Sequence, residues 1–237
     1  MKRGKLGRLK PSAIVAVGIV LGRGAQADTI ITFDGLSANN TPITAPFGSN
    51  VSASGPGVSV VGFGTPGISL DWFGTGGSTR WEYYNDAVWS AGQLNGSTNG
   101  TSHNILFTPT ASVAVSLESL NFHPYYVSAE TFSYNWSVIE ISPSSTSNVV
   151  SSGSINFSSD ATKNHPVNIN YTGNIGDGLT LRLERIGGTG SGQNIAVDDV
   201  RFAQVPEPST LALLSMGCLA GIAARARWRY ARKNQPS

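Results

Sequence analysis

The clearest structural signal in the chain is Leu179-Thr180-Leu181-Arg182-Leu183-Glu184, in which a leucine alternates with a polar residue over six positions. A repeat of two places the leucines on one face of a β-strand and the polar side chains on the other. The stretch therefore predicts a strand with one buried and one solvated face.

Similar short segments recur on both sides of this stretch. Val167–Tyr171 and Val113–Leu117 alternate in the same way. Shorter candidates are Ile31–Phe33, Val58–Val60, Ile68–Leu70, Ile105–Phe107, Val138–Ile141, Ile155–Phe157 and Ile195–Val197. No stretch of the body shows helical spacing with capping residues. Nine or ten such strands predict an all-β fold, an antiparallel two-sheet sandwich of the jelly-roll kind.

Two polar stretches interrupt the alternation. Residues 34–57 and 74–104 are rich in Gly, Ser, Thr and Asn, and the second contains an aromatic island at Trp81–Trp89. Both are expected to be long surface loops between strands. The whole body, residues 28–204, is of the size of one domain.

The charges are unevenly distributed along the chain. Eleven of the sixteen basic residues lie in the first 27 or the last 13 positions, which leaves five in the body against thirteen acidic residues. The body thus carries a net charge of −8. Because an acidic surface repels phosphate groups, a nucleic-acid partner is disfavoured.

The basic N-terminus has the order of a secretory signal peptide. Five cations in ten residues precede an apolar run over Ser12–Gly22, and Ala25-Gln26-Ala27 has the small-x-small form of a cleavage site. The apolar run is shorter than the roughly 20 residues needed to span a bilayer. Residues 1–27 are expected to form a cleavable signal helix that is removed before Asp28; a buried amphipathic helix is the alternative.

The C-terminus has its own order of motifs. Pro206-Glu207-Pro208 is followed by an apolar run, Leu211–Ala224, and then by an arginine-rich cluster over 225–233. As a helix, the run would span about 21 Å, which makes it a short transmembrane helix. The arginines are expected to stay in the cytoplasm, which leaves the body outside.

This order of motifs resembles the PEP-CTERM sorting domain of Gram-negative bacteria, here over 205–237. The resemblance implies recognition by exosortase, a multi-span membrane protease that cuts near Pro206, Glu207 and Pro208, which are recognition residues and not catalysts. It also implies an inner-membrane intermediate, then a cell-surface or extracellular-matrix location, with association with exopolysaccharide.

A second resemblance concerns the ends of the body. Ile30–Gly35 and Asn194–Phe202 resemble the first and last strands of galactose-binding-like jelly rolls, which lie near each other and often hold a structural calcium. The resemblance implies Asp198 or Asp199 as a Ca²⁺ ligand, and Asp34 as a weaker candidate, since Ca²⁺ takes six to eight oxygen ligands. The alternative is a strand end with solvated charges.

The aromatic island suggests a further kind of site. Exposed aromatic rings stack on sugars while carboxylates accept hydroxyl hydrogen bonds, and the island supplies both groups in Trp81, Glu82, Tyr83, Tyr84, Asp86 and Trp89. Packing of the same aromatic residues in the core is the favoured alternative. A polysaccharide is therefore a candidate partner of the body.

Enzymatic activity has little support in the sequence. Three isolated histidines show no metal-ligand spacing, no Gly-x-Ser-x-Gly motif is present, and the only cysteine, Cys218, lies in the C-terminal apolar run. Glu82 and Asp86 are the one carboxyl pair worth considering for a glycosidase. The expected function is that of a non-enzymatic surface or matrix protein, with a carbohydrate-binding module and an exported hydrolase as alternatives.

Overall fold

The computed structural model describes residues 27–36, 40–75, 80–85, 90–95, 101–124, 132–157, 164–188, 195–207, 217 and 221. The expected signal helix and the apolar run at 211–224 lie almost entirely outside these residues. Within the described ranges, no helix is long and apolar enough to cross a membrane.

The described chain is built from antiparallel strands. They are β1 (Ala27–Ile31), β2 (Thr41–Pro42), β3 (Val58–Val61), β4 (Ile68–Thr75), β5 (Arg80–Asn85), β6 (Ser90–Asn95), β7 (Ser102–Pro109), β8 (Val113–Pro124), β9 (Phe132–Ile141), β10 (Ser147–Phe157), β11 (His165–Thr172), β12 (Gly178–Gly188) and β13 (Ile195–Pro206). Each of the ten predicted segments overlaps one of them.

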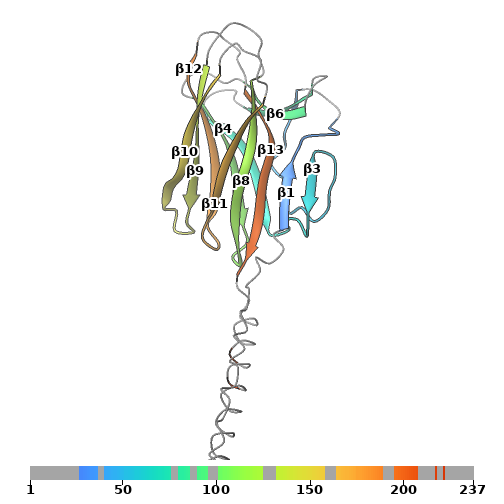
Figure 1. The fold of residues 1–237 in the computed structure, drawn as a ribbon, viewed down its shortest axis with the longest axis vertical. Coiled ribbons are helices and arrows are strands. Elements are labelled where there is room, and N and C mark those ends of the chain that lie inside the picture. The colour runs from blue at the N-terminus through green and yellow to red at the C-terminus, as the bar shows by residue number, and fades with distance from the viewer. Residues whose placement is uncertain are drawn as a thin grey trace, which may run out of the picture.

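The strands form two sheets that pack face to face (Figure 1). One sheet has eight strands, with the path β11-β8-β13-β6-β5-β2 and with β1 and β3 added beside β13. The other has five strands in the order β10-β9-β12-β7-β4. Successive strands often change sheet, as they do in jelly rolls. The predicted all-β antiparallel sandwich is confirmed.

The predicted number of strands is wrong, since β2, β5 and β6 have no counterpart among the predicted segments. Two of them lie within the expected loop 74–104, and β2 lies within the expected loop 34–57. The reason is that β5 does not alternate. Trp81, Glu82 and Tyr83 are all buried, so both of its faces are covered and no period of two is visible.

The core lies between the two sheets and is made of the inward faces of the alternating strands. Leu179, Leu181 and Leu183 are fully buried, as their alternation with polar residues predicts. Aromatic rings join the sheets, with Phe107 of β7 and Phe202 of β13 at 5.1 Å between ring centroids. Because the body has no cysteine, this packing replaces disulfides as the source of stability.

β13 runs through the middle of the larger sheet and changes partner halfway along. Ala196 and Val197 pair with β6, whereas the part from Val200 to Gln204 pairs with β1. Between them the register with β8 shifts, and Asp199 adopts a positive φ of 48°. Such a bulge bends a strand and redirects its side chains, so the acidic pair at 198–199 lies at the bend.

Candidate functional site

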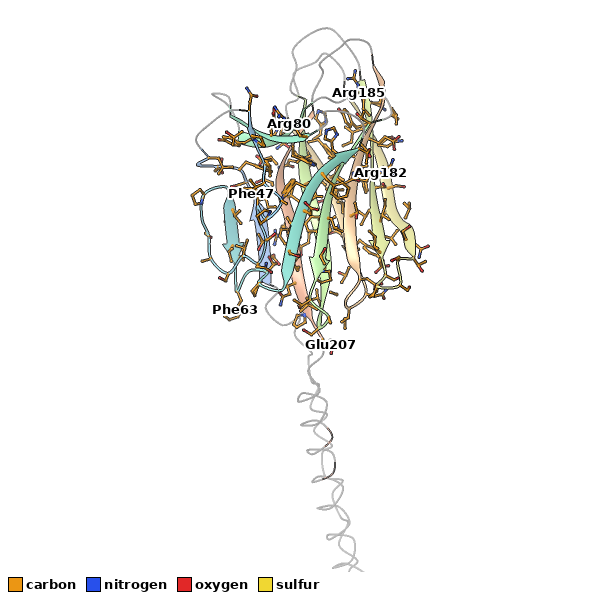
Figure 2. All side chains as sticks on the ribbon, turned by 180° about the vertical axis from the view of Figure 1, so that it is seen from behind. Phe47, Phe63, Arg80, Arg182, Arg185 and Glu207 are labelled. Atoms are coloured by element: carbon orange, nitrogen blue, oxygen red, sulfur yellow. The ribbon has the colours of Figure 1, made fainter. Side chains whose placement is uncertain are left out.

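The end of β13 carries the start of the Pro-Glu-Pro motif. Pro206 pairs with Val113 of β8, and the Glu207 amide donates a hydrogen bond to the Ser112 carbonyl at 3.2 Å. Pro206 and Glu207 are both exposed, at the tip of the sandwich that Figure 2 marks with Glu207. The folded sheet therefore extends past the expected boundary at 204 and into the motif itself.

The first strand lies directly beside this end. Ala27 of β1 pairs with Gln204 of β13, and Asp28 pairs with Ala203. The Gln204 carboxamide oxygen also accepts a hydrogen bond from the Gly67 amide at 2.7 Å. The first and last strands of the body are thus neighbours, as the galactose-binding-like resemblance implies. The expected signal cleavage point and the sorting motif lie at the same end.

A partly buried ion network joins these two strands to β8. The Arg201 guanidinium donates to Asp28, which is only 5% exposed, and its Nε lies 2.7 Å from a Glu118 carboxylate oxygen. Burial raises the pKa of Glu118, with a further rise from Asp28 and an opposing effect of Arg201. The sequence gives no signal for this network because Asp28 and Arg201 are 173 positions apart.

The aromatic island does not form an exposed sugar-stacking surface in the part that is described. Trp81 and Tyr83 are each 2% exposed and belong to the core. Trp81 packs edge-on against Trp72 of the opposite sheet, at 5.0 Å between centroids, and its Nε1 donates to the Asn104 carbonyl at 3.1 Å. For these two residues the core-packing alternative holds. The Tyr84 side chain, Asp86 and Trp89 lie outside the described residues.

Glu82 faces away from the core on β5 and is nevertheless 1% exposed. Its carboxylate lies 2.5 Å from the guanidinium of Arg80, which is largely exposed. Glu82 pairs with Gln93 of β6, which pairs with Ala196 of β13, which in turn pairs with His123 of β8. These four residues therefore lie side by side across the sheet. A buried carboxylate and a buried imidazole thus share the outer face of the larger sheet, roughly 14 Å apart by strand spacing.

The acidic residues at the bend of β13 form a second polar group on this sheet. The pKa of Asp198 is raised to about 8, chiefly by burial and also by the charges of Asp199 and Asp34, against the opposing effect of a hydrogen bond from the Asp199 amide. Asn121 donates to Asp199 at 2.7 Å, and His123 Nε2 lies 4.0 Å from Asp198. The pair is ionic only when the imidazole is protonated.

These side chains do not assemble into a ready metal site. Among the described residues, no group of three or more His, Cys, Asp or Glu side chains lies close enough to hold a metal ion. The electrostatic influence of Asp34 on Asp198 places the two predicted ligands in one region of the fold. The calcium therefore stays a prediction, and any ion there would draw its remaining ligands from carbonyl, amide or water oxygens.

Solved structures similar to the sandwich include carbohydrate-binding modules. One described as "CBM4 structure and function" is 13% identical, with a TM-score of 0.37, over 56% of this chain and 86% of that chain. The CBM22-1 xylan-binding domain of Paenibacillus barcinonensis Xyn10C is 15% identical, with a TM-score of 0.40, over 57% and 86%. A module described as specific for non-crystalline cellulose, CBM28, is 13% identical, with a TM-score of 0.42, over 70% of this chain and 98% of that chain. These distant similarities assign no ligand to this chain.

The C-terminal end has a more specific match. No curated protein matches the sequence of the chain. Residues 204–227, however, match the family model of the PEP-CTERM protein-sorting motif. Of these residues, 204–206 form the end of β13, and Glu207 follows it directly. The chain therefore carries a PEP-CTERM protein-sorting motif, fused without a spacer to an all-β sandwich.

Proposed function

We propose that the chain is a non-enzymatic protein of the cell surface or extracellular matrix, which exosortase-type processing delivers to its destination. The observation that carries the proposal is the sorting motif at residues 204–227. The body that this motif would deliver is a compact sandwich with a continuous apolar core. The proposed association with exopolysaccharide is supported only by the resemblance of the motif to the PEP-CTERM sorting domain.

A structural role of the body is supported by the burial and pairing of the residues that could otherwise bind a sugar or act as catalysts. Trp81 and Tyr83 fill the core, and His103 is fully buried with its ring 6.0 Å from that of Trp81. Glu82 is tied to Arg80. A glycan-binding or hydrolytic alternative would have to use other surfaces than the described part of the aromatic island.

The proposal is tested by changing the motif in the full chain. Glu207→Ala is expressed in a Gram-negative host with an exosortase and in the same host without it. Glu184→Ala, which changes a partly exposed side chain of β12, serves as the matched control. The unchanged protein and the control should lose the C-terminal segment and reach the outside only in the host with the protease. Glu207→Ala should accumulate uncut in the membrane fraction. Equal processing of all three chains would contradict the proposal.

The location and the absence of turnover need separate measurements. After export, treatment of intact cells with a polysaccharide-degrading enzyme should release the processed body, since the proposal places it in an exopolysaccharide layer. The purified protein should leave a panel of polysaccharides unhydrolysed. Hydrolysis that is lost in Glu82→Gln would favour the exported hydrolase instead.

A further inference from the structure

Three of the exposed large hydrophobic side chains in the described part of the chain lie at one end of the sandwich. Phe63 is 78% exposed and Val61 is 49% exposed, at the connection between β3 and β4. Ile175, which is 42% exposed, lies in the turn between β11 and β12. Exposed hydrophobic residues scattered singly are ordinary. These three, however, all lie near the point where β13 ends.

The strand order places that end between the two apolar turns. In the larger sheet, β13 has β1 and then β3 on one side, and β8 and then β11 on the other. With about 4.8 Å between neighbouring strands, β3 and β11 each lie about 10 Å from β13. Figure 2 shows Phe63 and Glu207 at the same end of the molecule. The chain thus leaves the sandwich with an apolar side chain on either side.

The turn that carries Phe63 is held in a fixed shape. Gly62 and Gly64 flank Phe63 with φ angles of 74° and 64°. The Thr65 amide donates to the Val51 carbonyl at 2.7 Å, which ties the base of the turn to the neighbouring segment. The phenyl ring is therefore presented to the outside by a constrained backbone.

The turn that carries Ile175 is equally well fixed. The Asn174 amide donates to a Glu140 carboxylate oxygen at 2.7 Å, and the Gly176 amide donates to the Val113 carbonyl at 2.9 Å. Tyr171 also donates to Glu140, at 2.8 Å, which joins the two sheets just above the turn. Two hydrogen-bonded turns thus each present an apolar side chain at one end.

This end carries few charges in comparison with the acidic body, and the exposed Glu207 at the chain exit is one of them. The turns at 62–67, 110–112, 142–146 and 173–177 contain no lysine or arginine and one acidic residue, Asp177. That carboxylate accepts a hydrogen bond from the Asn174 side chain at 3.1 Å. An end with few charges and with apolar tips suits a zwitterionic lipid surface, whereas a charged partner would find few groups to pair with.

The short segment between Glu207 and the apolar run limits the distance between this end and a membrane. Only three residues separate Glu207 from Leu211, where the apolar run begins, and four residue steps reach at most about 14 Å. If helical, the run would span about 21 Å, less than the roughly 30 Å of a hydrocarbon core. Such a mismatch draws the flanking residues toward the lipid interface.

We propose that this end of the sandwich, with Phe63 and Ile175 on either side of the chain exit, rests on the bilayer surface while the C-terminal segment is still attached. The inference rests on the proposed function, because it requires the membrane-embedded stage of sorting. The occupant is lipid, and the two apolar side chains would enter the interfacial layer. The sandwich would then stand upright with its opposite end away from the membrane.

The test uses the full chain in protein-free vesicles of zwitterionic lipid, which removes every protein partner. In a Cys218→Ser background, Phe63→Cys and Ile186→Cys are each labelled with an environment-sensitive fluorophore. Ile186 is a matched control, since it is 49% exposed but lies toward the opposite end of β12. The label at 63 should brighten severalfold, shift to the blue and be quenched by nitroxide lipids. The label at 186 should remain accessible to a water-soluble quencher.

The outcomes separate this inference from the function on which it rests. If the protein floats with the vesicles but both labels are equally quenched from water, the membrane contact is overturned and the sorting proposal stands. If the protein does not float with the vesicles, the membrane-embedded stage fails and the contact fails with it. An Ile175→Cys label that behaves like the one at 63 would support the two-point contact; one that behaves like the control would overturn it.

Discussion

Ala27 and Gln204 lie opposite each other on adjacent strands, although 177 positions separate them in sequence. The expected signal cleavage follows Ala27, and the sorting motif begins at Gln204. Because β1 lies between β13 and β3, a protease could cut after Ala27 only before this strand enters the sheet. The expected cleavage point and the start of the sorting motif therefore lie at the end of the sandwich that is proposed to rest on the membrane.

Replacing Trp81 with alanine should destabilise the body and not remove a binding surface selectively. The ring is 2% exposed and packs against Trp72, so its loss should cost about 3–5 kcal/mol of unfolding free energy. Chemical denaturation measures the loss. The control Phe63→Ala, at a site 78% exposed, should stay within about 0.5 kcal/mol. A stable Trp81→Ala protein that had lost glycan binding would restore the carbohydrate-binding alternative.

Arg201→Met should destabilise the body more than Arg182→Met does. Both arginine side chains are 41% exposed, but the paired Asp28 side chain is 6% exposed and the paired Glu184 side chain 35%. Removing Arg201 leaves a buried carboxylate without its cation, at a cost of about 2 kcal/mol. The more exposed pair should contribute less than about 1 kcal/mol. Equal losses in thermal unfolding would contradict the importance of the network.

Most of the fold follows from local sequence patterns, because a strand with one buried face shows its period directly. Leu179–Glu184 is the clearest case, and its three leucines are all fully buried. β5 escapes the same reasoning since both of its faces are covered, and β6, Ser-Ala-Gly-Gln-Leu-Asn, has too few apolar residues to show any period. These two strands thus lie where the pattern indicates a loop, and β2 does so in the other expected loop.

The candidate sites also differ in how far the sequence predicts them. Pro206 and Glu207 are recognisable because the motif is contiguous in sequence. The network of Asp28, Arg201 and Glu118 depends on pairing between distant strands, and no local pattern announces it. Trp81 is ambiguous in the sequence, because an aromatic ring serves a core and a sugar-binding face equally well.

The stability of the body in the presence of a chelator should fall as the pH rises from about 4 to about 8. Burial, together with the charges of Asp199 and Asp34, raises the pKa of Asp198 from its ordinary value of 3.8 to about 8 in the folded protein. The folded state therefore retains a proton in this range that the unfolded state has released, and each rise in pH favours unfolding. Thermal unfolding across the range measures the slope. Asp198→Asn should reduce it, and an unaltered slope would contradict the assignment to Asp198.

The same carboxylates provide the test of the predicted calcium. Above pH 8 the Asp198 side chain is ionised, so added Ca²⁺ should raise the melting temperature of the unchanged protein but not that of Asp198→Asn. Mg²⁺ serves as the control ion, since it prefers a tighter octahedral site. A melting temperature that is the same with Ca²⁺ and with chelator would rule out a structural ion here.

Gly64→Ala should weaken the fold at the turn that presents Phe63. A Cβ at Gly64 would overlap the Val51 carbonyl oxygen, and the φ angle of 64° is unfavourable for alanine. The expected cost is about 1–3 kcal/mol. Gly55→Ala is the matched control, because its added Cβ would meet nothing within 4 Å. Similar stability of the two variants in denaturant would show that this turn is not constrained.

Sorting through both ends of the chain is tested most directly by mass spectrometry of the termini, on protein purified separately from membrane and extracellular fractions of the exosortase-containing host. The extracellular form should begin at Asp28 and end near Pro206, Glu207 or Pro208, while the membrane form retains the C-terminal segment. An extracellular chain that still reaches Ser237 would contradict processing at the sorting motif.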